Sequence, residues 1–282
     1  MVLAAVYGAL RISGLPMRDQ IVVVYGAGTA GMGVADQIRD AMVADGATVE
    51  QATWQIWPIA SRGLLFDDMD TLRDFQIPYA KNRRQLGVPE EARVGLVDAI
   101  KMASPTMLLG CSTVPGAFTR DVIEAMVAST ERPLIFPISN PTSRMEAMPA
   151  DVLQWSDGKA LVATGSPVSP VQYHGTTYNI AQANNALVFP GLGLGVIVAG
   201  AKQVTKNMLD AAAKAVARQA DPTVPGARLL PDVTNLRSVS SVVAEAVYHA
   251  AVEDGVATNT HDHVVEAILD AMWVAEYAED IR

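Results

Sequence analysis

The residues of this chain best suited to hold a ligand are three glycines near its start. Gly26, Gly28 and Gly31 stand at G-x-G-x-x-G spacing. The first glycine permits a sharp turn, the second lets a pyrophosphate approach the backbone, and the third lets a helix pack closely on a sheet. Free N–H groups at the start of such a helix, with the positive end of its dipole, then hold the phosphates. The spacing predicts a dinucleotide-binding turn that also includes Thr29 and Ala30.

The segments around these glycines must supply a strand and a helix. Residues 21–25 are almost entirely apolar, and good helix formers run from the turn to Ala44. A bare glycine pattern also occurs in β–α turns that bind nothing. The flanking strand and helix are what favour the interpretation as a binding site.

Strands and helices alternate along the first two thirds of the chain. Expected strands lie at residues 55–59, 106–109, 134–138 and 160–163, and expected helices at 2–12, 93–103 and 118–128, with a helical turn at 67–75. Four more helices are expected at residues 191–202, 208–219, 238–255 and 263–277. This order predicts an α/β, Rossmann-like, doubly wound and mainly parallel sheet with helices on both faces and a helical C-terminal extension. No linker is evident, so we expect residues 1–282 to form a single domain.

Composition narrows the possible partners. The 282 residues carry a net charge of -9, and half of them are hydrophobic. The acidic balance argues against nucleic acid or an anionic membrane surface. The longest apolar stretch, residues 186–201, is too short to span a membrane and contains a proline and four glycines. The one basic cluster, residues 81–84, is interpreted as a solvated loop.

Cysteine usage indicates a reducing compartment. Cys111 is the only cysteine, so no disulfide can form within the chain. A cytoplasmic protein is expected on this ground. Cys111 has no evident general base near it in the sequence, so a nucleophilic role is disfavoured.

Four segments that follow the expected strands are rich in Gly, Pro, Ser and Asn. They are residues 110–119 (GCSTVPGAFT), 139–143 (SNPTS), 164–170 (TGSPVSP) and 181–195 (AQANNALVFPGLGLG). Ligands of open parallel sheets bind outside the carboxyl ends of the strands, so these segments are candidates to face a pocket. Each also has an ordinary interpretation, because Ser-Asn-Pro and similar sequences make plain turns.

Taken in order, the motifs GAGTAG, PGAFT, SNPTS, GSP and NNALVFPG resemble the NAD-binding domain of malic enzyme and its relative malolactic enzyme. The resemblance covers nearly the whole chain. It implies an enzyme that oxidises L-malate at C2, passes the hydride to a nicotinamide and releases pyruvate and CO2. It also implies a divalent Mg or Mn ion as Lewis acid, with a lysine and a tyrosine as base and acid.

The resemblance assigns roles to particular residues. It places Asn140 and Asn185 at the substrate and on the nicotinamide side, where amides can donate and accept without titrating. It places Gly165 and Ser166 along the nicotinamide. Cys111, Ser112 and Thr113 would then lie under the adenosine half.

Part of the implied active site has no counterpart in this sequence. Nothing matches the catalytic tyrosine, the lysine or the three acidic metal ligands, which lie upstream in the family. Asp67, Asp68 and Asp70 are clustered, but a solvated helix start explains them better than a metal site. We therefore expect no metal site here and no activity from the chain alone. Malolactic activity of the complete enzyme, or a non-catalytic dinucleotide-binding module, remain alternatives.

The type of nicotinamide cofactor depends on the end of the second strand. NAD sites place an acid there to bond the ribose 2′-hydroxyl. This chain has Ala60, followed by Ser61 and Arg62. The absence of the acid and the presence of a nearby arginine favour tolerance of NADP, whereas the resemblance favours NAD. We expect NAD, with NADP possible. A homo-oligomer is also expected, formed through an exposed apolar face of the first helix.

Overall fold

The computed structural model describes residues 1–221 and 223–273. Their contacts divide them into two compact units. The first comprises Met1–Asn184 and Ala217–Asp232, and the second comprises Asn185–Val216 and the residues from Val233 on. The assignment of residues 1–282 to a single domain stays a prediction.

The first unit is built on a seven-stranded sheet in the order β3-β2-β1-β4-β5-β6-β9. Its strands are β1 (Val22–Tyr25), β2 (Ile56–Ala60), β3 (Gly63–Leu64), β4 (Met107–Gly110), β5 (Leu134–Pro137), β6 (Leu161–Thr164) and β9 (Ala181–Gln182). All neighbouring strands are parallel except β2 and β3, which form an antiparallel pair. The strand order reverses at β1 and β4, so their carboxyl ends open a crevice. The predicted Rossmann-like class is confirmed.

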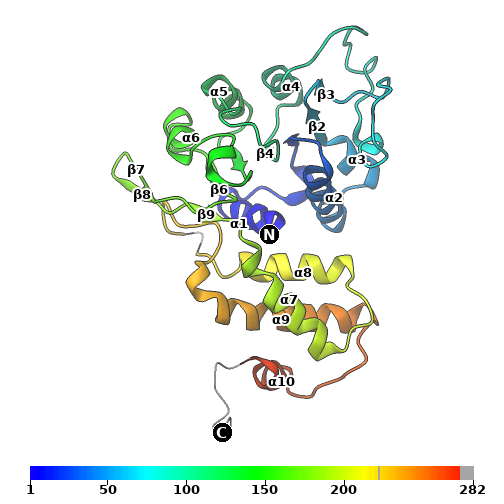
Figure 1. Ribbon diagram of the computed structural model, residues 1–282, viewed down its shortest axis with the longest axis vertical. Helices are drawn as coiled ribbons and strands as arrows, with labels where there is room; N and C mark the ends of the chain where they lie inside the picture. The colour runs from blue at the N-terminus through cyan, green and yellow to red at the C-terminus, as the bar shows by residue number, and fades with distance from the viewer. Residues whose placement is uncertain (222, 274–282) are drawn as a thin grey trace, which may run out of the picture. The chain divides into compact units, whose positions relative to one another are not determined.

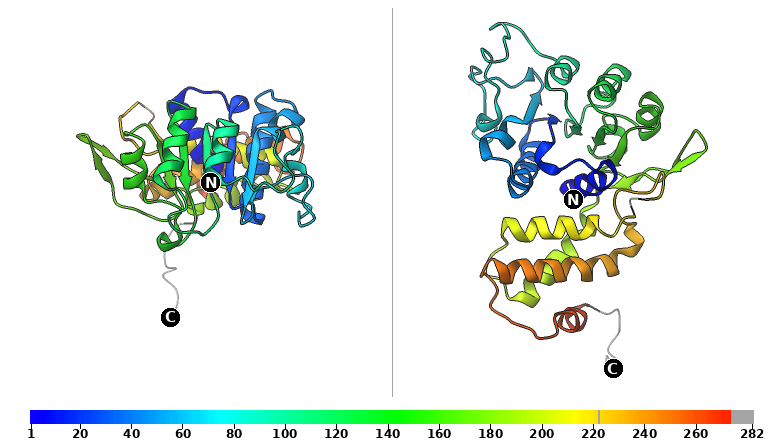
Figure 2. Two further views of the ribbon diagram at one scale, coloured as in Figure 1. Left: turned by 90° about the horizontal axis from the view of Figure 1, so that it is seen from above. Right: turned by 180° about the vertical axis from the view of Figure 1, so that it is seen from behind.

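Helices cover both faces of this sheet (Figures 1 and 2). The helices of the first unit are α1 (Val2–Ser13), α2 (Thr29–Ala44), α3 (Val49–Trp54), α4 (Leu96–Ala103), α5 (Arg120–Ser129) and α6 (Pro149–Trp155). Helices α4, α5 and α6 lie on one face, and α1 and α2 lie on the other. Because both faces are covered, the central strands are continuously apolar, with β4 and β5 buried at every position.

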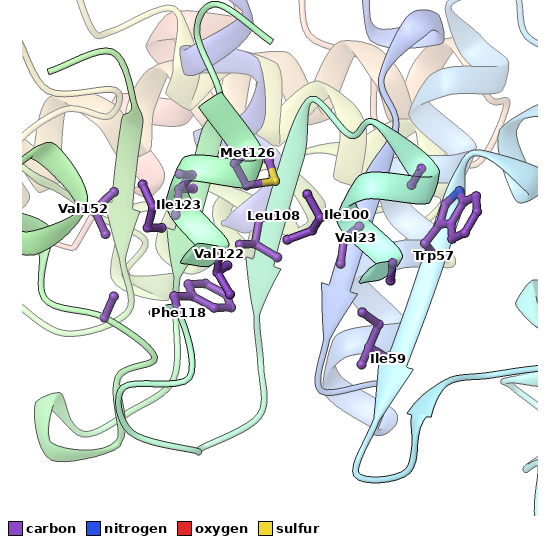
Figure 3. Packing of buried hydrophobic residues seen from close by; sticks show 14 of the residues in the cluster. Val23, Trp57, Ile59, Ile100, Leu108, Phe118, Val122, Ile123, Met126 and Val152 are labelled. Carbon is purple, nitrogen blue, oxygen red and sulfur yellow. The ribbon is translucent and has the colours of Figure 1, made fainter. Parts of the chain in front are cut away.

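A hydrophobic core fills the space between the sheet and helices α4 to α6. Val23, Leu108 and Ile135 sit side by side in register across β1, β4 and β5. Figure 3 shows Val23 and Leu108 beside Ile100 of α4 and Val122 of α5. This packing fixes the strands whose carboxyl ends carry the predicted binding loops.

Most predicted elements of the first unit are present within a few residues of their expected bounds. The helical turn expected at residues 67–75 is wrong, since this stretch is a series of turns followed by a short 3-10 helix, Ile77–Tyr79. Helices α3 and α6 and the separate hairpin of β7 (Val171–Tyr173) and β8 (Thr176–Tyr178) were not predicted.

The second unit is helical. It contains α7 (Phe189–Ala199), most of α8 (Lys206–Ala217), α9 (Leu236–Glu253) and α10 (Val264–Ala271). Helices α7 and α9 approach closely because Gly191 and Gly195 of α7 face α9, and a Cβ on either glycine would lie 2.6 Å from a backbone oxygen of α9. The four helices predicted for this part of the chain are present. The end of the last one, expected at residues 274–277, lies outside the described residues.

The first helix does not offer the exposed apolar face that was the reason for expecting a homo-oligomer. Leu3, Val6 and Leu10 of α1 are all buried. The homo-oligomer stays a prediction, without this argument. No helix in the described part of the chain is long and apolar enough to cross a membrane.

Candidate dinucleotide site

The glycine turn after β1 has the conformation that the sequence predicted. Gly26 has a φ of 106°, and a Cβ there would overlap the backbone of Cys111 on the loop after β4. A Cβ on Gly31 would overlap the carbonyl oxygen of Gly26, so this glycine lets α2 lie against the turn. Gly28 differs, because a Cβ there meets no atom within 4 Å. Gly26 and Gly31 are thus required by the fold, whereas Gly28 faces open space.

The start of α2 is available to an anion. Gly28 is the N-cap residue, and no side chain among the described residues caps the helix. The amide groups of Thr29, Ala30 and Gly31 are the first three of the helix, which lack acceptors within it. The sixteen residues of α2 align their dipoles toward the same end. These groups can bind a phosphate without any cationic side chain.

A pocket of about 460 Å³ lies at the carboxyl ends of β1, β2 and β4, where the strand order reverses. Six of the predicted cofactor-binding residues line it, namely Gly26, Gly28, Ser61, Arg62, Cys111 and Ser112. Another part of the pocket lining, which was not predicted, consists of Thr71, Arg73 and Gln76. Gln76 is held there because its side-chain amide donates to the carbonyl of Ala27 at 2.5 Å.

A second group of predicted residues meets at the ends of β5 and β6. The Ser166 hydroxyl donates to the side-chain oxygen of Asn140 at 2.5 Å. Gly165 lies beside them, where a Cβ would come within 3.0 Å of both polar atoms of the Asn140 amide. Asn140 itself is exposed. The structure therefore brings Asn140, Gly165 and Ser166 together, with the Asn140 amide accessible to a ligand.

One buried carboxylate, Glu146, links the loops after β4 and β5 and was not predicted. Its Oε1 accepts hydrogen bonds from the backbone N–H and the hydroxyl of Ser112, both at 2.8 Å, and from the hydroxyl of Ser139 at 2.6 Å. The Ser139 hydroxyl oxygen in turn accepts from the N–H of Thr113 at 3.0 Å. Glu146 is fully buried. It has no sequence signal, because a single Glu in an irregular segment normally lies on the surface.

Gly110 makes room for this carboxylate. A Cβ at Gly110 would lie 2.6 Å from the Glu146 carboxyl group. Burial and then the Glu146 charge raise the pKa of Cys111 to about 12. The thiol is therefore neutral near pH 7, which makes it a poor nucleophile.

The acidic and basic clusters of residues 67–70 and 81–84 contact each other. Asp68 forms an ion pair of 2.6 Å with Arg83, and Asp67 accepts from the Asn82 side chain at 2.8 Å. The interpretation of residues 81–84 as a solvated loop is wrong for Lys81 and Arg83, which are 1% and 6% exposed. In the described residues no group of three or more His, Cys, Asp or Glu side chains could hold a metal ion.

Asn185 belongs to the second unit. It opens a short 3-10 helix, Asn185–Leu187, just before α7. Its predicted contact with substrate and nicotinamide stays a prediction.

A doubly wound sheet with a glycine turn, an uncapped helix start and a pocket at the strand-order reversal defines a dinucleotide-binding protein of the Rossmann type. The family model described as "Malic enzyme, NAD binding domain" matches residues 1–252. The chain belongs to the malic enzyme family and is its NAD-binding domain.

Similar proteins support this assignment. A "Putative malate oxidoreductase [NAD]" of Mycobacterium tuberculosis is 70% identical over 98% of this chain and 50% of its own length. "NAD-dependent malic enzyme 3" of Bacillus subtilis is 47% identical, and a "Malolactic enzyme" of Lactococcus lactis is 44% identical, each over 98% of this chain. The chain spans about half the length of these curated relatives.

The solved structures agree on the fold. The malic enzyme of Pyrococcus horikoshii superposes with a TM-score of 0.73 at 24% identity, covering 96% of this chain and 57% of that one. An NAD-dependent malic enzyme of Thermotoga maritima gives a TM-score of 0.64 at 25% identity, covering 88% and 56%.

Proposed function

We propose that the pocket at the ends of β1, β2 and β4 binds NAD, and that the chain supplies the dinucleotide half of a malate-oxidising enzyme. The observation that carries this proposal is the uncapped start of α2 beside a pocket lined by Gly26 and Gly28. The names of the relatives support NAD as the cofactor and malate as the substrate of the complete enzyme. Pyruvate is assigned as its product by the family resemblance.

The chain's own residues have positioning roles in this scheme. The amides at the start of α2 hold the pyrophosphate, and the Ser112 loop, fixed by Glu146, lies beneath the adenosine. The exposed Asn140 amide, oriented by Ser166, can bind the substrate carboxylate or the nicotinamide amide. Asn185 is assigned the same role by family resemblance. By family resemblance, a divalent cation in the complete enzyme would polarise the substrate.

Hydride transfer from malate also needs a base for the hydroxyl proton. The titratable side chains that line the pocket are Tyr25, Arg62, Arg73 and Cys111. Cys111 keeps its proton near pH 7 because its pKa is raised. No His, Asp or Glu is among the described residues that line the pocket. We therefore propose that the chain binds the cofactor but does not turn over malate alone. Robust formation of pyruvate by the purified chain would contradict this proposal.

Substitution at Gly28 tests the binding site. A valine side chain at this position has space in the fold but projects where the pyrophosphate must approach, so Gly28→Val should leave the protein folded and weaken NADH binding. The loss should be at least about tenfold, because each displaced hydrogen bond to a phosphate contributes about 1.5–3 kcal/mol. The matched control is Gly33→Val, which lies inside α2 rather than at its N-cap and also has open space around its Cβ. Equal affinities of the two variants in a fluorescence titration would argue against this pocket.

The malolactic alternative rests on the 44% identity to the Lactococcus lactis enzyme. Product analysis of a complete enzyme containing this chain distinguishes pyruvate from lactate. A non-catalytic module is the other alternative, and it predicts neither product. We also propose a cytoplasmic setting, supported by the single free thiol of Cys111.

A further inference from the structure

A second pocket, of about 470 Å³, lies at the amino ends of β5 and β6, at the edge of the sheet opposite to the dinucleotide pocket. Arg132 lies just before β5, and Lys159 and Ala160 lie just before β6, and all three line this pocket. All of its described lining residues belong to the first unit, and none of them lines the dinucleotide pocket. The two pockets are therefore distinct.

The course of the chain beside β6 opens this pocket. Strand β9 pairs with the last two residues of β6 but not with the first two, which line the pocket. Just before β9, the backbone N–H of Asn179 donates instead to the carbonyl of Gly226 at 2.8 Å. Gly226 permits this close approach, because a Cβ there would overlap the carbonyl oxygen of Thr177. The chain around Asn179 therefore follows the segment near Gly226 rather than β6.

The pocket has an apolar floor and a cationic rim. Leu153, Leu161 and Leu229 line it and are almost fully buried. Lys159 is exposed and Arg132 is half-buried, so the charged side chains lie nearer to solvent than the leucines do. An apolar cavity with a few polar groups at fixed positions is typical of small-molecule sites.

The charge at this rim is entirely positive. Arg132 and Lys159 line the pocket without any Asp or Glu among the lining residues that the structure describes, although the chain has 30 acidic and 21 basic residues. The Arg132 Nε donates to the carbonyl of Lys159 at 3.1 Å, which joins the two loops that carry these cations. Neither side chain has an ion-pair partner in the described part of the chain. Both remain available to an anion.

We propose that this pocket is a second ligand site, which binds a small organic anion with an apolar body. The head group is a carboxylate or a phosphate, which matches the donors of arginine and lysine, and it contacts Arg132 and Lys159. The apolar body lies against the buried leucines of the floor. This site goes beyond the proposed function and does not depend on it, because the two pockets share no described lining residue.

Isothermal titration calorimetry of the purified chain with octanoate and with octyl phosphate tests this site. We expect at least one of them to bind with a stoichiometry of one, and to bind equally well with and without saturating NADH. The better of the two heads identifies the ligand as a carboxylate or a phosphate. Butanoate should bind more weakly than octanoate, because each buried CH2 group contributes up to about fourfold in affinity. Octanol, which lacks the charge, should bind at least about tenfold more weakly than the better anion.

Two substitutions test the cationic rim. Arg132→Gln should weaken the better anion by at least about tenfold, because a charge-assisted hydrogen bond is lost. Lys159→Gln should weaken it by about two- to fivefold, because an exposed ion pair contributes less. The Lys159 side chain makes no hydrogen bond to a described residue, so this variant leaves the fold intact even if Arg132→Gln loosens the two loops. Arg84→Gln, at an exposed arginine outside the pocket, is the matched control and should leave the affinity unchanged.

Three results would overturn the site. One is binding of neither octanoate nor octyl phosphate, and another is an affinity of Lys159→Gln and Arg132→Gln equal to that of Arg84→Gln. The third is displacement of the bound anion by NADH, which would place the anion in the dinucleotide pocket. Failure of NADH to bind would overturn the proposed function instead, and anion binding that depends on Arg132 and Lys159 would still support this second site.

Discussion

Removing Glu146 should loosen two loops of the candidate site at once. This carboxylate accepts three hydrogen bonds of 2.8 Å or less, from the N–H and hydroxyl of Ser112 and from the hydroxyl of Ser139. Hydrogen bonds to a charged group contribute about 1.5–3 kcal/mol each. If a water molecule takes the place of the carboxylate in one of the three hydrogen bonds, the other two are lost. Glu146→Ala should then lower the free energy of unfolding by at least about 3 kcal/mol. Urea denaturation followed by circular dichroism measures this loss.

The conservative variant separates charge from shape. Glu146→Gln keeps an acceptor oxygen in nearly the same place but loses the charge, which makes its hydrogen bonds roughly half as strong. We expect about half the destabilisation of Glu146→Ala. We also expect a lower pKa for Cys111, because the Glu146 charge is one of the two causes that raise it. The rate of Cys111 alkylation against pH reports this pKa.

A suitable control is Glu131→Ala, since Glu131 is exposed on the loop before β5. Its free energy of unfolding should stay within about 0.5 kcal/mol of the original chain. The reasoning would be refuted if Glu146→Ala were as stable as this control. It would also be refuted if Glu146→Ala lost stability while Glu146→Gln left the pKa of Cys111 unchanged.

Two further predictions concern stability. Burial lowers the pKa of Lys81 to about 7 from its ordinary value of 10.5, so the unfolded chain binds more protons between these pH values and stability rises with pH across that window. The free energy of unfolding of Lys81→Met, taken relative to that of the original chain, should therefore fall by about 2 kcal/mol from pH 7 to pH 9. The cation–π contact between Lys81 and Trp54 offsets part of this change. The control Lys101→Met, at an exposed lysine, should show no such trend. Gly31→Ala should destabilise by about 1–3 kcal/mol, because its Cβ would overlap a backbone oxygen. Gly33→Ala should be neutral or stabilising by up to about 1 kcal/mol, since the same helix gains propensity without a clash. Thermal unfolding of the two glycine variants would contradict this reasoning if both shifted in the same direction.

Several tertiary features depart from what local sequence indicated. Residues 67–75 were expected to form a helical turn, but Asp67 and Asp68 pair with Asn82 and Arg83 instead, which holds the chain in turns. A run of Lys and Arg usually lies in water, yet Lys81 is buried with its ammonium group 4.6 Å from the Trp54 ring. Such pairings join segments that lie far apart in the chain, so no local pattern reveals them.

The sequence by itself determined the strand–turn–helix of residues 21–44, the alternation that makes a parallel sheet, and the position of the candidate loops. These features depend on local properties: glycine conformations, the apolar periodicity of strands and helices, and the rule that parallel strands share their carboxyl edge. Only the tertiary structure decided that Glu146 ties two of those loops together and that Arg62 is held by a hairpin on the pocket wall. The Glu146–Ser112 contact joins segments distant in the chain, and the place of Arg62 on the pocket wall depends on the strands that the sheet brings beside β2. The local sequence does not specify these neighbours.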